Sequence, residues 1–333
     1  MKWITSIGRI CGVAVVLSAT SLAPSFASAD NFPQKNRSIS LIVPYGAGGM
    51  VDVMGRALAA HWDAKWGTRT VVLNKPGANG QLAFAEMLKQ KADGYTIVLT
   101  QSFDTQMTYL DPEANAPFSR SSFMPVGLVQ STPAPWVVRA DSPYKTVNDL
   151  IDAAKARPHS LNFGSPASRG PAILYMNELE QQFGAKLNVI PFNDVPSTVN
   201  ALLGGHIDAA TANAAVVLPH VNAGRLRVLM VAGDQPLKYF PDAPPSTAIG
   251  IHLPDFSNTG MALKSGTSPD VLQAWSSMLA QIAEEPALRS RLDQIGVNLA
   301  YMSPSDYTQL WLRAEDSVAR VLMKLTGKTR QAQ

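Results

Sequence analysis

A glycine-rich turn near the start of the chain has the composition of an anion-binding loop. The stretch LIVPYGAGGMVDVMGR, residues 41–56, begins as an apolar run, passes through Gly-Ala-Gly-Gly, and continues with helical spacing. Glycines let the backbone approach a small molecule closely, and the N–H groups at a helix N-terminus favour negative charge. The residue types at 44–50 are therefore those that a backbone anion site needs.

A second turn in the middle of the chain repeats this arrangement. The segment FGSPASRGP, residues 163–171, follows a short apolar stretch and precedes a helix that we expect from about Ala172. Either turn alone would be an ordinary tight connection between a strand and a helix. Two matched turns that face each other would instead favour a binding site for a small anion.

Motifs for nucleotide binding are absent from these turns. The dinucleotide fingerprint needs a third glycine where this chain has Val51, and an acidic residue after the second strand where it has Asn74. No Gly-Lys-Ser/Thr follows Gly49, so a P-loop is excluded as well.

Motifs for catalysis and metal binding are also missing. Ser165 follows a strand, but the residues around it lack the G-x-S-x-G pattern of a hydrolase nucleophile. The five histidines form no H-x-x-x-H pair, and no D-x-D-x-D loop occurs. We therefore predict no catalytic residue, no metal and no cofactor. A triad assembled from distant residues stays open, because it would leave no local motif.

The first 29 residues have the features of a secretory signal peptide. Lys2 and Arg9 give a positive start, residues 10–22 are apolar and uncharged, and Ala27-Ser28-Ala29 matches a cleavage site. Cleavage would remove the only cysteine, Cys11, and would lower the net charge from +3 to +1 because two basic residues leave. Without a basic cluster, this charge argues against nucleic acid. We expect an exported, periplasmic protein.

Alternating strand and helix patterns predict an α/β fold with a parallel sheet and helices on both faces. In the first part, residues 116–131 are turn-rich and predict irregular structure. The regular elements expected there are strands Ser38–Val43, Val71–Asn74 and Thr96–Thr100 and helices Val51–Lys65 and Leu82–Lys91.

The rest of the chain repeats the alternation. Thr146 is the expected N-cap of a helix over Val147–Ala156, with Asp149 completing a capping box. Further strands are expected at Trp136–Arg139, Leu161–Gly164 and in LNVIPF, DAATA and LRVLMVAG, and helices at Ser268–Glu284, Pro286–Ile295 and Ser303–Lys324. We divide the mature chain into a first lobe, residues 30–134 plus 255–333, and a second lobe, residues 135–254. The loops at 44–50, 101–105, 165–171 and 191–196 would then face the cleft between them.

Several longer stretches resemble one family along the whole mature chain. Pro44, Gly48, Gly49, Asp52 and Arg56 match the family pattern P-x-x-x-G-G-x-x-D-x-x-x-R, and residues 74–80 match N-x-P-G-A-x-G. The segments LNFGSPASRGP and VIPFNDVPSTVNALLGGHIDA continue the likeness. The chain thus resembles the Bug family of extracytoplasmic solute receptors, the binding components of tripartite tricarboxylate transporters.

This resemblance implies a two-lobed type II periplasmic-binding-protein fold that closes on a small organic carboxylate without transforming it. It implies integral membrane transporter subunits as partners and a monomeric receptor. Asp52 and Arg56, one helical turn apart, are interpreted as a structural pair that stiffens the first loop. The ligand-binding residues that it nominates are Tyr45, Gly46, Ala47, Gly48, Gly49, Met50, Val51, Ser102, Ser165, Pro166, Ala167, Arg169, Gly170, Phe192 and Asp194.

Some residues depart from the usual family pattern. Met50 and Val51 are apolar where Gly and Ser or Thr are common, and with Phe192 they suggest an aromatic or otherwise apolar acid. Arg169 is either a carboxylate clamp or an exposed cation, and Asp194 either meets a ligand donor or caps the next helix. The alternative functions are an exported α/β hydrolase and a ligand sensor for a signalling kinase.

Overall fold

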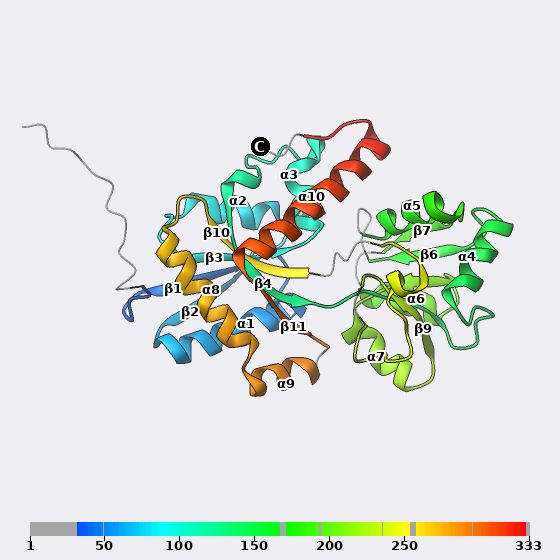
Figure 1. Ribbon diagram of the computed structural model, residues 1–333, viewed down its shortest axis with the longest axis horizontal. Helices are drawn as coiled ribbons and strands as arrows, with labels where there is room; N and C mark the ends of the chain where they lie inside the picture. The colour runs from blue at the N-terminus through cyan, green and yellow to red at the C-terminus, as the bar shows by residue number, and fades with distance from the viewer. Residues whose placement is uncertain are drawn as a thin grey trace, which may run out of the picture.

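The computed structural model describes residues 32–48, 50–166, 171–192, 195–234, 236–253, 258–294 and 296–330. The expected signal peptide, residues 1–29, lies outside these ranges. The chain forms two α/β lobes that lie side by side, each built on its own sheet (Figure 1). We call the lobe around the six-stranded sheet the first lobe and the lobe around the five-stranded sheet the second lobe.

The sheet of the first lobe is mixed, with the order β11-β4-β10-β3-β1-β2. β1 lies between β2 and β3 and is parallel to both, whereas β10 is antiparallel to β3 and β4. The strands are β1 (Ser38–Val43), β2 (Arg69–Asn74), β3 (Thr96–Gln101), β4 (Phe123–Ser131), β10 (Asn258–Lys264) and β11 (Leu299–Met302).

Helices cover both faces of this sheet. α1 (Met50–Trp66) and α8 (Pro269–Ala283) contact each other on one face, and α10 (Pro304–Thr326) packs on β4 and α3 (Asp104–Leu110) on the other. The remaining helices of the lobe are α2 (Gln81–Lys89) and α9 (Pro286–Gln294), with the short turns η2 (Ala78–Gly80), η3 (Pro112–Ala114) and η4 (Arg120–Ser122).

The second lobe has the strand order β7-β6-β8-β5-β9, in which β5 alone runs antiparallel to its neighbours. Its strands are β5 (Pro135–Arg139), β6 (Asn162–Ser165), β7 (Asn188–Pro191), β8 (Ala209–Thr211) and β9 (Leu226–Val231). Its helices are α4 (Val147–Ala156), α5 (Pro171–Phe183), α6 (Val195–Leu203), α7 (Ala214–Asn222) and η5 (Ser246–Ile249).

A buried polar network holds the hinge between the lobes. The Gln130 side chain donates to Thr132 Oγ1 at 2.6 Å and accepts from Thr259 Oγ1 at 2.7 Å. These three side chains are buried, so the hydrogen bonds satisfy groups that would otherwise be costly to remove from water. The network ties the end of β4, which leads directly into β5, to the start of β10.

Local sequence signals set several helix boundaries. Thr146 Oγ1 accepts from Asp149 N–H while the Asp149 carboxylate accepts from Thr146 N–H, which confirms the predicted capping box and the bounds of α4. At the start of α10, Ser303 Oγ accepts from Asp306 N–H and Pro304 takes the first helical position; Gly327 ends that helix in a left-handed conformation.

Close packing explains one glycine in the middle of β10. A Cβ on Gly260 would lie 2.2 Å from the ring of Tyr307, so only glycine lets α10 approach this strand. The Tyr307 hydroxyl then hydrogen-bonds Thr100 Oγ1 on β3 at 2.7 Å. The C-terminal helix is thereby fixed across the centre of the first sheet.

Three predictions about the elements were wrong. Residues 123–131, expected to be irregular, form the longest strand of the first sheet, because β4 pairs with both β10 and β11. Both sheets are mixed rather than parallel, since strands return antiparallel at the hinge. The helices α3 and α7 and the strand β11 were not predicted. β10 brings the chain back from the second lobe into the first sheet.

Candidate functional site

The loop after β1 stands at the carboxyl edge of the first sheet. Pro44 is buried, Tyr45 is half-buried, and Gly46, Ala47 and Gly48 are exposed. A Cβ added at Gly46 or Gly48 would meet no atom within 4 Å, so open space lies in front of the loop. Gly48 has φ +81°, a conformation that favours glycine. The loop therefore offers its backbone to a small molecule.

Asp52 holds this loop from behind. Its carboxylate accepts hydrogen bonds from Gly48 N–H at 2.8 Å, Arg56 Nε at 3.0 Å and Asn74 Nδ2 at 2.9 Å. Asn74 Nδ2 also donates to the carbonyl of Tyr45 at 3.1 Å. These bonds confirm the predicted pairing of Asp52 with Arg56 and link the loop after β1 to the end of β2.

Charge-assisted hydrogen bonds keep Asp52 ionised. Burial works to raise the pKa of this carboxyl, but hydrogen bonds from Arg56, Gly48 N–H and Asn74 outweigh it and hold the pKa below its usual value. Because the Gly48 N–H already donates to the Asp52 carboxylate, this group is not available to a ligand. An anion in front of the loop would bind other backbone groups.

A second contact joins the loops after β1 and β3. Tyr45 Oη donates to Asp104 Oδ2 at 2.9 Å, and Asp104 is the first residue of α3. The preceding residue, Phe103, is buried and has φ +75°, which is strained for a side chain of this size. Ser102 N–H donates to the Asn258 carbonyl at 2.9 Å and anchors the loop to the hinge.

The Tyr45–Asp104 pair lies in a poorly solvated place. Burial raises the pKa of Asp104 to about 6, although the hydrogen bond from Tyr45 acts in the opposite direction. Burial and the neighbouring Asp104 charge raise the pKa of Tyr45 well above its usual value, so the phenol stays protonated and remains the donor.

The matching edge of the second lobe is built from buried groups. Ser165 at the end of β6 is fully buried, and its carbonyl accepts from Phe192 N–H at 2.8 Å. Trp136 Nε1 and Thr211 Oγ1, which stand opposite each other on β5 and β8, are buried without a hydrogen-bond partner within the described residues. Orphaned polar groups of this kind call for a ligand or a water molecule.

The nominated residues outside α1 fall into three groups. Tyr45, Gly46, Ala47, Gly48 and Ser102 gather at the first-lobe edge. Ser165, Pro166 and Phe192 belong to the second-lobe edge. Gly49, Ala167, Arg169, Gly170 and Asp194 lie outside the described residues, so the clamp and cap interpretations remain predictions.

Three nominated apolar residues pack against the hydrophobic interior. Val51 is 7% exposed and belongs to the hydrophobic core under α1, and the half-buried Met50 packs against the same core. Phe192 packs against a core cluster of the second lobe. Sequence reasoning also missed Asp104 and Thr211. Asp104 falls within the predicted loop 101–105, so its carboxyl group was the available signal.

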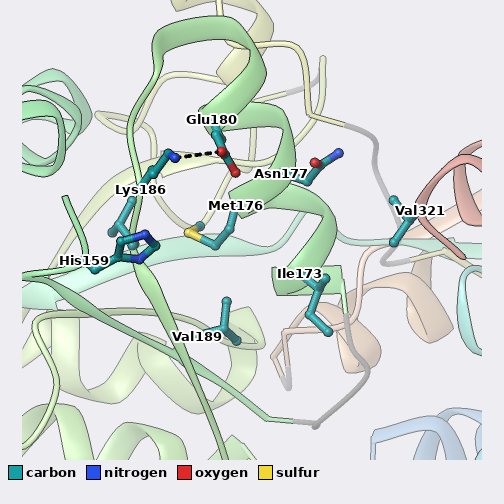
Figure 2. Close-up of a pocket in the computed structure, with 9 residues that line it drawn as sticks. His159, Ile173, Met176, Asn177, Glu180, Lys186, Val189 and Val321 are labelled. Atoms are coloured by element: carbon teal, nitrogen blue, oxygen red, sulfur yellow. Dashed lines mark ion pairs between the residues drawn. The ribbon is translucent and has the colours of Figure 1, made fainter. Parts of the chain in front are cut away.

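Other cavities lie away from these loops. Figure 2 shows residues that line one of them, among them Ile173 and Met176 of α5 and Val321 of α10. This cavity has a volume of about 190 Å³, and the Lys186 and Glu180 side chains at its wall form an ion pair at 3.2 Å. A larger cavity of about 630 Å³ borders the hinge between α10 and the second lobe. Its walls mix Arg313 and Arg320 with Glu178 and Asp234, so no single ligand charge is favoured.

Within the described ranges, no three His, Cys, Asp or Glu side chains gather closely enough to hold a metal ion. No helix of the described chain has the length and apolar composition to cross a bilayer.

Comparison with known proteins identifies relatives over most of the chain. Residues 54–326 match the family described as the tripartite tricarboxylate transporter family receptor. A Cupriavidus necator protein, named for its position in the gbd 5′ region, is 32% identical over 94% of this chain and 95% of its own length. The protein BugT of Bordetella pertussis is 30% identical over 79% of this chain and 81% of its own length.

Solved structures share the fold. A TctC solute-binding protein from Polaromonas superposes with a TM-score of 0.77 at 30% identity, covering 88% of this chain and all of that one. An R. palustris protein solved with adipate gives a TM-score of 0.70 at 22% identity, covering 90% of this chain and 99% of that one. At that identity the likeness concerns the fold alone.

Proposed function

The chain belongs to the tripartite tricarboxylate transporter receptor family, and we propose that its cleft captures a small organic carboxylate for delivery to the membrane subunits of such a transporter. Receptors of this family bind solutes outside the cytoplasm. The predicted Bug-family identity is confirmed by the family match and by BugT.

The observation that carries the proposal is the set of hydrogen bonds that fixes the first-lobe loop. Asp52, Asn74 and Tyr45 hold the exposed turn 46–48 in one conformation with open space in front of it. A loop fixed in advance loses little conformational entropy when a ligand binds, so its backbone groups bind more tightly than those of a mobile loop. The family description, a receptor of tripartite tricarboxylate transporters, supports an organic acid as the ligand.

The finer features of this function are part of the proposal. We place ligand contacts at the nominated residues of the two edges, with lobes formed by 30–134 plus 255–333 and by 135–254. The N-terminal segment is removed near Ala29, and the receptor acts as a monomer in the periplasm. Ser165 is fully buried, which speaks against its use as a hydrolase nucleophile.

A thermal-shift screen of the purified protein tests the proposal. The panel contains aliphatic dicarboxylates, tricarboxylates, aromatic acids and their neutral amides as matched controls. A ligand present at 100 times its dissociation constant adds about 2.7 kcal/mol to the free energy of unfolding. We expect at least one acid, but not its amide, to raise the Tm and to be recovered unchanged. If amides stabilise equally or an acid is chemically altered, the proposal fails.

A further inference from the structure

An unpaired carboxylate stands beside the proposed ligand loop. Asp104 follows β3 as Tyr45 follows β1, and these two strands are parallel neighbours, so their carboxyl ends open on the same edge of the sheet. The 2.9 Å hydrogen bond from Tyr45 Oη brings the two loops together at that edge. A ligand bound in front of residues 45–48 would therefore lie at the same edge of the sheet as Asp104.

The structure leaves half of this carboxylate open. Tyr45 binds Oδ2, and Oδ1 has no hydrogen bond within the described residues. No lysine, arginine or histidine of the described chain forms an ion pair with Asp104. The residue keeps part of its surface exposed. A carboxylate that is poorly solvated and unpaired is costly unless a donor reaches it.

A purely acidic ligand would make this cost larger. Its carboxylate, bound at the neighbouring backbone of residues 45–48, would face the Asp104 charge at short range, and like charges in a partly buried site repel each other. A hydroxyl or ammonium group on the same ligand would reverse this effect, because it would donate to Oδ1 and complete the hydrogen bonding of Asp104.

Resting on the proposed function, we infer that Asp104 selects carboxylic acids that also carry a hydrogen-bond donor, a hydroxyl or an ammonium group, over plain acids of the same skeleton. Tyr45 holds Oδ2 and thereby directs Oδ1 toward the ligand. The upward shift of the Asp104 pKa, caused by burial, agrees with a carboxyl group that has no cationic partner among the described residues.

Matched ligands test this inference by isothermal titration calorimetry of the purified full chain. Each series keeps one carbon skeleton and exchanges hydrogen for hydroxyl or ammonium: succinate, malate and aspartate; glutarate, 2-hydroxyglutarate and glutamate; 4-methylbenzoate, 4-hydroxymethylbenzoate and 4-aminomethylbenzoate. In at least one series we expect a donor-bearing acid to bind about tenfold or more tightly than the plain acid, as suits a hydrogen bond to a charged group. The hydroxyl and ammonium members show which donor the site takes.

Two variants assign the preference to Asp104. Asp104→Asn keeps the size and can still accept from Tyr45, and we expect it to reduce the preference to about threefold or less. Asp93→Asn is the matched control, because Asp93 lies just before the other end of β3 and pairs with Arg37 on the surface; its preference should equal that of the wild type. A single cooperative melting transition of each ligand-free variant, with no fall in the Tm of Asp104→Asn, establishes folding.

The outcomes separate this inference from the proposed function. If plain acids bind as tightly as their donor-bearing partners, or if Asp104→Asn keeps the full preference, the inference is overturned while the carboxylate receptor stands. If no acid of any series binds, the proposed function fails and this inference fails with it.

Discussion

The two lobes present edges of different construction to each other. On the first lobe, hydrogen bonds connect the ends of three strands. Asp52 accepts from Gly48 N–H and from the Asn74 side chain, and Asp104 accepts from the Tyr45 hydroxyl. On the second lobe, β6 and β8 end in the buried residues Ser165 and Thr211. Two polar atoms there, Trp136 Nε1 and Thr211 Oγ1, have no partner within the described residues.

This difference indicates that the two edges contribute to ligand binding in different ways. The first-lobe edge is fixed by its own hydrogen bonds before a ligand arrives, so it acts as a rigid wall. The second-lobe edge holds unused hydrogen-bonding capacity, which a ligand or an ordered water molecule can satisfy. Substitutions on the two edges should therefore differ in their effect on the free protein.

The largest effect is expected for Asp52→Ala. This variant leaves the Gly48 N–H, the Asn74 amide and the Arg56 guanidinium without their common acceptor. We expect the free energy of unfolding in urea to fall by about 2–3 kcal/mol, and acid binding to weaken as the loop loosens.

Arg56→Ala is the control for Asp52→Ala. The Arg56 side chain is 50% exposed, so its loss should lower the free energy of unfolding by about 1 kcal/mol or less. Equal losses of stability in the two variants would show that Asp52 acts only through its ion pair with Arg56. The hydrogen bonds from Gly48 and Asn74 would then not stabilise the loop.

A medium effect with a defined pH dependence is expected for Asp104→Asn. The folded state raises the pKa of this carboxyl from 3.8 to about 6, so the ionised form destabilises the ligand-free protein above about pH 6 and this penalty vanishes below about pH 4. The variant should exceed the wild type in stability by about 1 kcal/mol at pH 7.5 and equal it at pH 4.

Urea denaturation at both pH values measures this difference. Asp52 has the opposite sign, because its lowered pKa stabilises the folded state above about pH 4 and this stabilisation disappears in acid. A variant at position 104 that is less stable than the wild type at pH 7.5 would contradict the assignment of Asp104 as an uncompensated charge.

The smallest effect is expected for Thr211→Val on the second-lobe edge. Because its hydroxyl has no partner within the described chain, we expect the free energy of unfolding to change by no more than about 0.5 kcal/mol. Thr259→Val is the matched control: Thr259 is equally buried but donates to Gln130 at 2.7 Å, so its loss should cost about 1–2 kcal/mol. A large loss of stability in Thr211→Val would remove the contrast between the two edges.

Much of this molecule follows from local sequence. The apolar run of β1, the capping box of α4 and the Ser-Pro start of α10 depend on neighbours within a few residues, so their patterns predicted the elements closely. The Asp52–Arg56 pair was also predictable, because a spacing of four residues places two side chains on one face of a helix. The family motif located the glycine loop in the same way.

Contacts between distant residues were decided only by the tertiary structure. β4 looked irregular, since its strand character depends on pairing with β10 and β11, which lie far along the chain. Val51 appeared to face a ligand, but the turn of α1 directs it into the core. The pairing of Tyr45 with Asp104 joins loops 59 positions apart, and it exists because β1 and β3 are adjacent in the folded sheet. The sequence determined which turns have the composition of an anion site. The order of the strands in the folded sheet decided that the carboxylate of Asp104 lies beside the first of these turns.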